Sequence, residues 1–206
     1  MGRARIYDRE IVALALPALG ALAAEPLYLL ADTAIVGHLG TTQLAALALA
    51  ATALGAVTTV FNFLVYGTTA QVARAHGAGD RERAHELGSQ AVWLGVGLGC
   101  TLAVLTALLA GPAITLLGRH GHVADFAARY MRISAVGLPA VLLATAGQGY
   151  LRGISALRRP LEIVIAANLA NLILELVLVY GLGLGLDGSA LGTAIASASS
   201  TSATRL

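Results

Sequence analysis

The sequence predicts an all-α membrane protein, a bundle of six transmembrane helices that forms a single membrane domain over residues 1–206. Hydrophobic residues make up 57% of the chain and charged residues 12%, where about 25% is usual for a soluble domain. Apolar stretches long enough to cross a bilayer core of about 30 Å follow one another between short charged segments. No stretch alternates with the period of two that a membrane β-barrel requires.

The six spans are expected near residues 11–39, 44–72, 87–117, 133–151, 161–184 and 190–203. The first three exceed the roughly 20 residues that a spanning helix needs, so they should tilt, bend or extend beyond the bilayer. Pro17 and Pro26 mark expected bends in the first span, because proline cannot donate to the helix ladder. The last segment rises only about 21 Å at 1.5 Å per residue. We therefore expect a truncated sixth helix.

Arginine placement predicts the orientation of the bundle, because positive residues are retained on the cytoplasmic side. Nine arginines lie on one side of the predicted spans and three on the other. The chain is therefore expected to be a multi-pass protein of the cell membrane with a cytoplasmic N-terminus. Asp80 is expected to cap a short polar helix in a cytoplasmic loop. The cytoplasmic set comprises Arg3, Arg5, Arg9, Arg74, Arg81, Arg83, Arg152, Arg158 and Arg159, and the outer loop carries Arg119, Arg129 and Arg132.

Two glycine patterns have structural interpretations. Gly183, Gly185 and Gly188 spell GxGxxG, but a membrane span and not a strand precedes them, so we interpret them as an outer turn and not as a dinucleotide site. Three pairs have the GxxxG spacing of closely packed membrane helices. These pairs are Gly95/Gly99, Gly149/Gly153 and Gly181/Gly185.

The sequence has few residues of the kinds that form metal sites, disulfides or catalytic pairs. His120 and His122 lack a firm third ligand beside Asp125, so no metal site is expected. Cys100 is the single cysteine, which excludes an intrachain disulfide, and no nucleophile and base stand out as a pair, so no enzyme is expected. A net charge of +2 is too small to indicate a nucleic-acid surface.

Acidic residues inside the spans carry the functional signal. Glu25 and Asp32 lie in the first span and Glu175 in the fifth. An ionised carboxylate at the bilayer centre costs about 2.5 to 3.5 kcal/mol on insertion scales, so such residues usually face an aqueous cavity and serve proton or ion traffic. Asn168 and Asn171 precede Glu175 with helical spacing and give the fifth span one polar stripe. The alternative is that these acids only join helices by hydrogen bonds.

Four stretches resemble one family of transporters in order along the chain. Leu14 to Gly40, LALPALGALAAEPLYLLADTAIVGHLG, is similar to the first helix of multidrug and toxic compound extrusion (MATE) transporters, especially the DNA-damage-inducible F branch. Tyr66 to Asp80 resembles the end of the second helix and the loop after it. Gly149 to Pro160 resembles the loop after the fourth helix, and Asn168 to Ser197 the fifth helix and the start of the sixth.

The resemblance implies the N-terminal half of a twelve-helix, two-lobe transporter that exports organic, often cationic, compounds against an inward flow of H⁺ or Na⁺. It implies no other cofactor, and as partners it implies membrane lipid, the small organic substrate and the missing C-terminal lobe. Asp32, Asn171 and Glu175 match the coupling residues of the family, Pro17 the proline at the bend of the first helix, and Tyr28 and Thr193 cavity residues. Glu175 replaces the family's aspartate, and Gln148 stands where the fourth helix often has asparagine.

Three other functions stay open at this point. A flippase of the same superfamily would move lipid-linked sugars, but it should carry basic residues deep in its spans for the pyrophosphate. A membrane-embedded enzyme could use the acids as general acid and base. The chain could also be a non-functional truncated fragment, because only one of two lobes is present.

Overall fold

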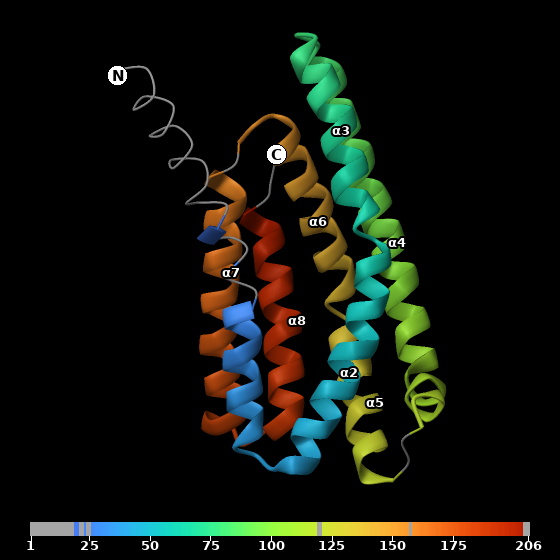
Figure 1. Ribbon diagram of the computed structural model, residues 1–206, viewed down its shortest axis with the longest axis vertical. Coiled ribbons are helices and arrows are strands. Elements are labelled where there is room, and N and C mark those ends of the chain that lie inside the picture. Colours follow the sequence, from blue (N-terminus) through green and yellow to red (C-terminus); the bar gives the residue numbers. More distant parts are fainter. Residues whose placement is uncertain (1–18, 21–22, 24–25, 119–120, 157, 204–206) are drawn as a thin grey trace, which may run out of the picture.

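The computed structural model describes residues 19–20, 23, 26–118, 121–156 and 158–203 and shows helices and turns there, with no strand in that part of the chain (Figure 1). A helix over Pro26–Gly37 is followed by α2 (Thr41–Val60) and α3 (Phe63–Gly77). Together α2 and α3 form one nearly continuous helical segment of 37 residues, Thr41–Gly77. The remaining elements are α4 (Arg81–Leu116), α5 (His122–Ala135), α6 (Leu138–Gly153), α7 (Arg158–Leu176), a π-helical turn over Val177–Gly181 and α8 (Gly185–Ala203). Pro17 and Glu25 lie outside the described residues.

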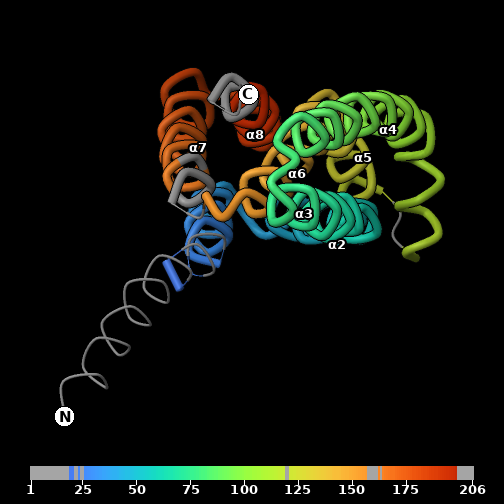
Figure 2. Tube along the Cα trace, turned by 90° about the horizontal axis from the view of Figure 1, so that it is seen from above, coloured from blue at the N-terminus to red at the C-terminus, as the bar shows by residue number. Residues whose placement is uncertain are grey.

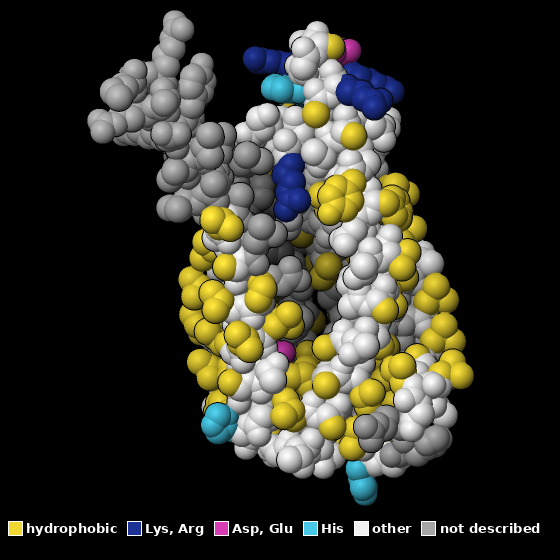
Figure 3. Space-filling view, viewed as in Figure 1, with side chains coloured by type: hydrophobic (Ala, Val, Ile, Leu, Met, Phe, Trp, Pro, Cys, Tyr) yellow, Lys and Arg dark blue, Asp and Glu magenta, His cyan; other side chains and the backbone are white. Residues whose placement is uncertain are grey.

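Seen along the bundle, the helices form two groups (Figure 2). One group holds the Pro26–Gly37 helix, α7 and α8, and the other holds α2 to α6. α8 joins the groups because it packs against α5 and α6 as well as α7. Hydrophobic side chains cover the flanks of the visible face, whereas arginines gather at the end where α3 meets α4 (Figure 3). This distribution is that of a bundle whose flanks face lipid.

Three helices in the described part are long and apolar enough to cross a membrane, and the pair α5 and α6 would make a fourth if it forms one span. The chain is therefore a multi-pass membrane protein. The predicted count of six spans is not established by these lengths and stays a prediction, as does a truncated last helix. α8 begins at Gly185 and not near 190, so its 19 residues rise about 28 Å.

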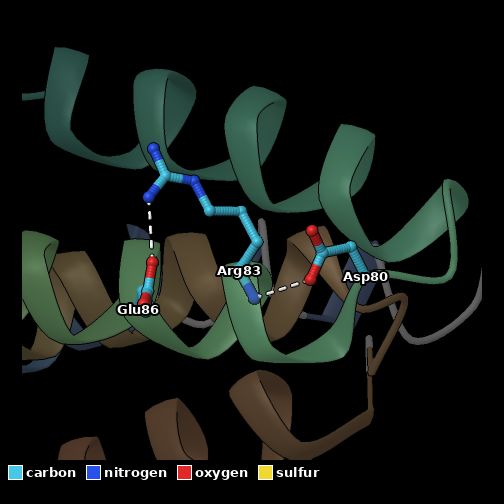
Figure 4. A network of polar contacts seen from close by, with 3 residues as sticks. All are labelled: Asp80, Arg83 and Glu86. Atoms are coloured by element: carbon cyan, nitrogen blue, oxygen red, sulfur yellow. Dashed lines mark hydrogen bonds and ion pairs between the residues drawn. The ribbon is translucent and has the colours of Figure 1, made fainter.

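Two segments predicted to connect spans contain longer helices than expected. Asp80 does cap a helix, since its Oδ1 accepts a hydrogen bond from the backbone N of Arg83 at 2.9 Å, and Arg83 pairs with Glu86 one turn on (Figure 4). This helix does not stop before the third span, however, because it is the first part of the 36-residue α4. The loop predicted around Arg129 and Arg132 is instead largely helical. These residues lie on α5, whose axis meets that of α6 at 54°.

Two of the three GxxxG pairs lie at helix contacts. A Cβ atom added to Gly99 on α4 would lie 2.5 Å from Cα of Pro139 on α6, and one on Gly153 of α6 would lie 2.7 Å from Cβ of Val72 on α3. Their partners Gly95 and Gly149 have comparably close neighbours on the same helices. These glycines allow α3 and α4 to approach α6 more closely than any side chain would permit.

The third pair, Gly181/Gly185, has no such contact with another helix. Gly185 is the first residue of α8 and Gly183 lies in the turn before it, and these two glycines adopt positive φ angles of 57° and 67°. Glycine adopts this backbone conformation without the strain that other residues incur. The first part of GxGxxG therefore forms a turn as predicted, whereas Gly188 lies within α8.

Candidate functional site

Four polar side chains are buried where the Pro26–Gly37 helix meets α7 and α8. Exposed fractions are 5% for Asp32, 6% for Asn171, 1% for Glu175 and 0% for Ser189. Tyr28 and Thr193 are half-buried beside them and are joined to them by hydrogen bonds. We call these six residues the polar cluster. Because buried polar groups are costly, their concentration at one place in an apolar bundle indicates a functional site.

Helix spacing and small residues bring the cluster together. Asn171 and Glu175 are one turn apart on α7, and Ser189 and Thr193 are one turn apart on α8. A Cβ atom on Gly192 would lie 3.3 Å from Oδ1 of Asn171 and 3.4 Å from the backbone N of Glu175. α8 therefore passes α7 closely enough for its hydroxyl groups to reach the side chains of the first helix.

The hydroxyl and amide groups form a directed chain of hydrogen bonds. Nδ2 of Asn171 donates to the hydroxyl of Tyr28 at 2.7 Å. Oγ1 of Thr193 donates to the carbonyl of Ser189 at 3.1 Å, so its contact of 3.4 Å with the Tyr28 hydroxyl has the tyrosine as donor. Separately, Oγ of Ser189 donates to Oδ1 of Asp32 at 3.0 Å. Both carboxyl groups of the cluster therefore lie near hydrogen-bond donors, but only Asp32 accepts a hydrogen bond from one of them.

Glu175 is in a different position from Asp32. Neither of its carboxyl oxygens, nor Oδ1 of Asn171, has a hydrogen-bond partner among the described residues. Glu175 also lies within electrostatic range of Asp32, and no arginine enters the cluster in the described part of the chain. An ionised carboxylate that is buried without a donor or a cation is strongly disfavoured. The arrangement therefore favours a neutral group at Glu175 and can hold or release a proton there.

The structure unites most of the residues that the sequence singled out and leaves some apart. Asp32, Asn171 and Glu175 meet with Tyr28 and Thr193 as described above. Gln148 lies on α6, outside the three helices of the cluster. Pro26 begins the described part of the first helix, and the bends predicted at Pro17 and Pro26 fall at or beyond its edge. Asn168 lies one turn from Asn171 and borders a groove.

This groove has a volume of about 210 Å³ and lies between the first helix and α7. Its walls are apolar apart from Tyr28 and Asn168. The other lining residues are Leu27, Ala31, Ile165, Leu169 and Leu172. Tyr28 therefore borders both the groove and the polar cluster.

Two residues of the site were not predicted from the sequence. Ser189 is buried beside Asp32, and Tyr130 of α5 is buried within electrostatic range of the same carboxylate. Ser189 had a recognisable signal, because it lies one turn before Thr193 and completes a polar stripe on α8. Tyr130 has no such signal, because the sequence predicts a loop for its segment.

Metal binding finds no support in the part of the chain that the structure describes, where no three His, Cys, Asp or Glu side chains gather. His120 lies outside those residues, so the predicted absence of a site around His120, His122 and Asp125 stays a prediction.

Comparison with known proteins agrees with this architecture. The family model MatE matches residues 17–177. The chain is 33% identical to Protein DETOXIFICATION 44, chloroplastic, of Arabidopsis thaliana over 90% of its own length and 38% of that protein. It is 32% identical to DNA damage-inducible protein F of Escherichia coli, over 92% of this chain and 41% of that one. The chain thus spans about two fifths of the length of these curated relatives.

Solved structures give the same result. An outward-facing multidrug resistance MATE family transporter of the MOP superfamily superposes with a TM-score of 0.86 at 27% identity, covering 93% of this chain and 42% of that chain. A MATE structure in a bent conformation superposes with a TM-score of 0.87 at 26% identity. Because the family model covers most of the chain and the fold agrees, this chain belongs to the MatE family, the multidrug and toxic compound extrusion transporters.

Proposed function

We propose that the chain forms the N-terminal lobe of a secondary transporter that exports small organic, often cationic, compounds in exchange for inward-moving protons. The observation that carries this proposal is the pair of buried acids, Asp32 and Glu175, in a membrane bundle without a basic partner in the described cluster. Relatives include proteins named as probable multidrug resistance proteins, for example one from Neisseria meningitidis at 30% identity. These names support drugs as substrates, and the two buried acids favour cationic ones.

The chemistry of the acids supports coupling to protons. Each carboxyl group loses its charge when it binds a proton, and a neutral cluster is far less costly within a bilayer than a charged one. An organic cation and a proton then compete for the same negative charge. This competition is the differential affinity that exchange requires.

The cluster also provides a route from protonation to movement. Asp32 and Tyr28 lie on the first helix, and their hydrogen-bond partners lie on α7 and α8. A change of charge at Asp32 or Glu175 therefore alters the contacts that hold the first helix against the other two. In the proposed cycle this shift exposes or closes the adjoining apolar groove, which offers a surface to the apolar part of a substrate.

A second lobe completes the transporter in this proposal. Alternating access needs one helical bundle to move against another around a central site, and the chain spans 38% and 41% of the two curated relatives described above. We also propose that the protein lies in the cell membrane with its N-terminus in the cytoplasm, because the arginine-rich end is expected to face inward.

Transport by a completed protein tests the proposal. The chain is joined to the C-terminal lobe of the E. coli relative and expressed in E. coli that lacks its main drug pumps, and export of ethidium is followed by fluorescence. We expect export that stops when an uncoupler collapses the proton gradient. Asp32→Asn keeps an oxygen that can accept from Ser189 but removes the negative charge for which proton and cation compete, so it should slow export by about tenfold or more.

Glu86→Gln provides a matched control, because Glu86 is an exposed acid at the arginine-rich end and pairs with Arg83 in the described part of the chain. This variant should export normally. Export that survives the uncoupler and follows a sodium gradient would contradict coupling to protons. Normal export by both Asp32→Asn and Glu175→Gln would contradict the proposed site.

A further inference from the structure

The end of the first helix is tied to the segment that follows α7 by a hydrogen bond outside the polar cluster. The hydroxyl of Tyr180 donates to the backbone carbonyl of Ile35 at 2.8 Å. Ile35 lies in the last turn of the Pro26–Gly37 helix, where carbonyl groups have no partner further along the helix. The backbone N of Leu39 does not supply one, because it donates to the carbonyl of Val36 at 3.0 Å. Tyr180 therefore caps a carbonyl group that the first helix itself leaves without a donor.

A π-helical turn brings Tyr180 within reach of this carbonyl. The turn spans Val177–Gly181, and the backbone N of Leu182 donates to the carbonyl of Val177 at 2.9 Å, five residues back instead of four. One extra residue in a turn rotates the residues at and beyond its end by up to about 100° relative to an uninterrupted α-helix. The direction of Tyr180 toward the first helix therefore depends on this wider turn.

Close packing of α8 holds the π-helical turn in place. A Cβ atom added to Gly188 on α8 would lie 2.9 Å from the carbonyl carbon of Leu178 and 3.0 Å from the backbone N of Val179. The side chain of Val179 is buried as well. Contact between two backbones leaves no flexible side chain to absorb a change in the turn. The π-helical turn is therefore a fixed part of the contact with α8, and Tyr180 extends from it to the first helix.

We propose that Tyr180 is a positioning residue of the transporter: through the carbonyl of Ile35 it holds the first helix, and Asp32 less than one turn earlier on it, in place against α7. This inference rests on the proposed function and adds to it a residue outside the polar cluster. The bonds that Tyr28 and Asp32 make to α7 and α8 belong to the cluster, so they change with its charge. The bond from Tyr180 to a backbone carbonyl does not, and it keeps the C-terminal end of the first helix in place while the cluster changes.

A tyrosine at the end of a membrane helix has a simpler interpretation as an anchor at the bilayer interface. The ring of Tyr180 is half exposed and fits that role. Its hydroxyl, however, donates to Ile35, a buried residue of another helix. An anchor would act on the helix that carries it, whereas the proposed role acts on the first helix. The decisive measurement is therefore made on the first helix.

The position of the first helix in the purified 206-residue chain tests the inference without any need for transport. Spin labels are attached to cysteines that replace Leu30 on the first helix and Ile173 on α7, in a Cys100→Ser chain in lipid nanodiscs. Both labelled positions are exposed, at 67% and 62%. Loss of one hydrogen bond changes the population of the held position by about two- to tenfold. We therefore expect one narrow distance distribution in the parent chain and a broader or second distribution in Tyr180→Phe.

Tyr66→Phe is the matched control. Tyr66 lies on α3, is 71% exposed and shows no side-chain hydrogen bond in the described structure. Removal of its hydroxyl should leave the distance distribution unchanged. Identical distributions in Tyr180→Phe and Tyr66→Phe would overturn the proposal.

Export by the fused transporter shows whether the held position matters for the site. Tyr180→Phe should raise the ethidium concentration that gives half-maximal export by up to about tenfold, because Asp32 is out of place in part of the molecules. A variant that only destabilises the protein lowers the maximal rate, through the amount of active transporter, and leaves this concentration unaltered. An unaltered concentration in Tyr180→Phe would therefore refute the positioning role.

The inference and the proposed function can fail separately. A fused transporter whose export ignores the proton gradient would contradict the proposed function. The spin-label distances do not depend on that result, and they show whether Tyr180 holds the first helix. Conversely, equal distances in the two phenylalanine variants would leave proton-driven export intact.

Discussion

Replacement of Gly99 by alanine measures how closely α4 and α6 are packed. The added Cβ atom would lie 2.5 Å from Cα of Pro139, a backbone atom that cannot rotate away. Carbon atoms prefer separations of about 3.5 to 4.0 Å, so the helices would have to part by about 1 Å. Overpacking of this kind costs about 1 to 3 kcal/mol. We therefore expect Gly99→Ala to destabilise the bundle.

Gly97 offers a matched control on the same helix. Nothing lies within 4 Å of a Cβ atom added there. Gly97→Ala should raise the free energy of unfolding by up to about 1 kcal/mol, because alanine is the better helix former. Gly88→Ala should fall between the two, since its closest neighbour is the ring of Tyr150, which is a side chain and can shift.

The assay is unfolding of the purified chain in mixed micelles, with the helical signal followed during titration with a denaturing detergent. The expected order of stability is Gly97→Ala, then Gly88→Ala, then Gly99→Ala. Equal unfolding free energies for Gly97→Ala and Gly99→Ala would refute the close α4–α6 contact. A loss in both variants would point instead to a cost of alanine on α4 that is unrelated to packing.

Three further changes test other parts of the molecule. Tyr28→Phe leaves the Asn171 amide without its acceptor and should cost about 1 to 3 kcal/mol of unfolding free energy, so unchanged stability and export would contradict the hydrogen-bond chain. Asp80→Ala removes the α4 cap and should lower the free energy of unfolding by about 0.5 to 2 kcal/mol. The loss should appear as faster amide exchange in the first turn of α4, and unchanged exchange would show that the cap is dispensable. A cysteine in place of Arg81 in a Cys100→Ser background should resist an impermeant reagent in intact cells, and labelling from outside would reverse the predicted topology.

Hydropathy predicted where the apolar helices lie but not where they end. Hydropathy predicts the third span over 87–117, yet α4 begins at Arg81, because a helix continues into water once its first turn is capped. Hydropathy does not reveal α5, because its arginines lower the mean hydropathy to that of a loop. One face of this amphipathic helix is nevertheless buried. The π-helical turn after Leu176 left no pattern that a regular helical period could reveal.

The site was predictable to the extent that its residues are costly in a membrane. Asp32 and Glu175 stand out in the sequence because a charged carboxyl group is costly in hydrocarbon and is rare there without a functional role. Ser189 is inexpensive in a helix, so its polar stripe with Thr193 is visible in the sequence but its contact with Asp32 follows only from the packing of α8. Spacing alone also could not separate Asn171, which binds Tyr28, from Asn168, which borders the groove.

The glycine contacts of α6 have a consequence for the order in which the protein assembles. α6 packs tightly against both α3 and α4, and both of these helices are synthesised before it. Within lipid no hydrophobic effect draws helices together, so close van der Waals contact has to supply the attraction. The glycine face of α4, and the face of α3 that later contacts Gly149 and Gly153, therefore stay exposed to lipid until α6 inserts beside them. Formation of this part of the bundle should be cooperative, with both earlier helices gaining their closest contacts in a single late step.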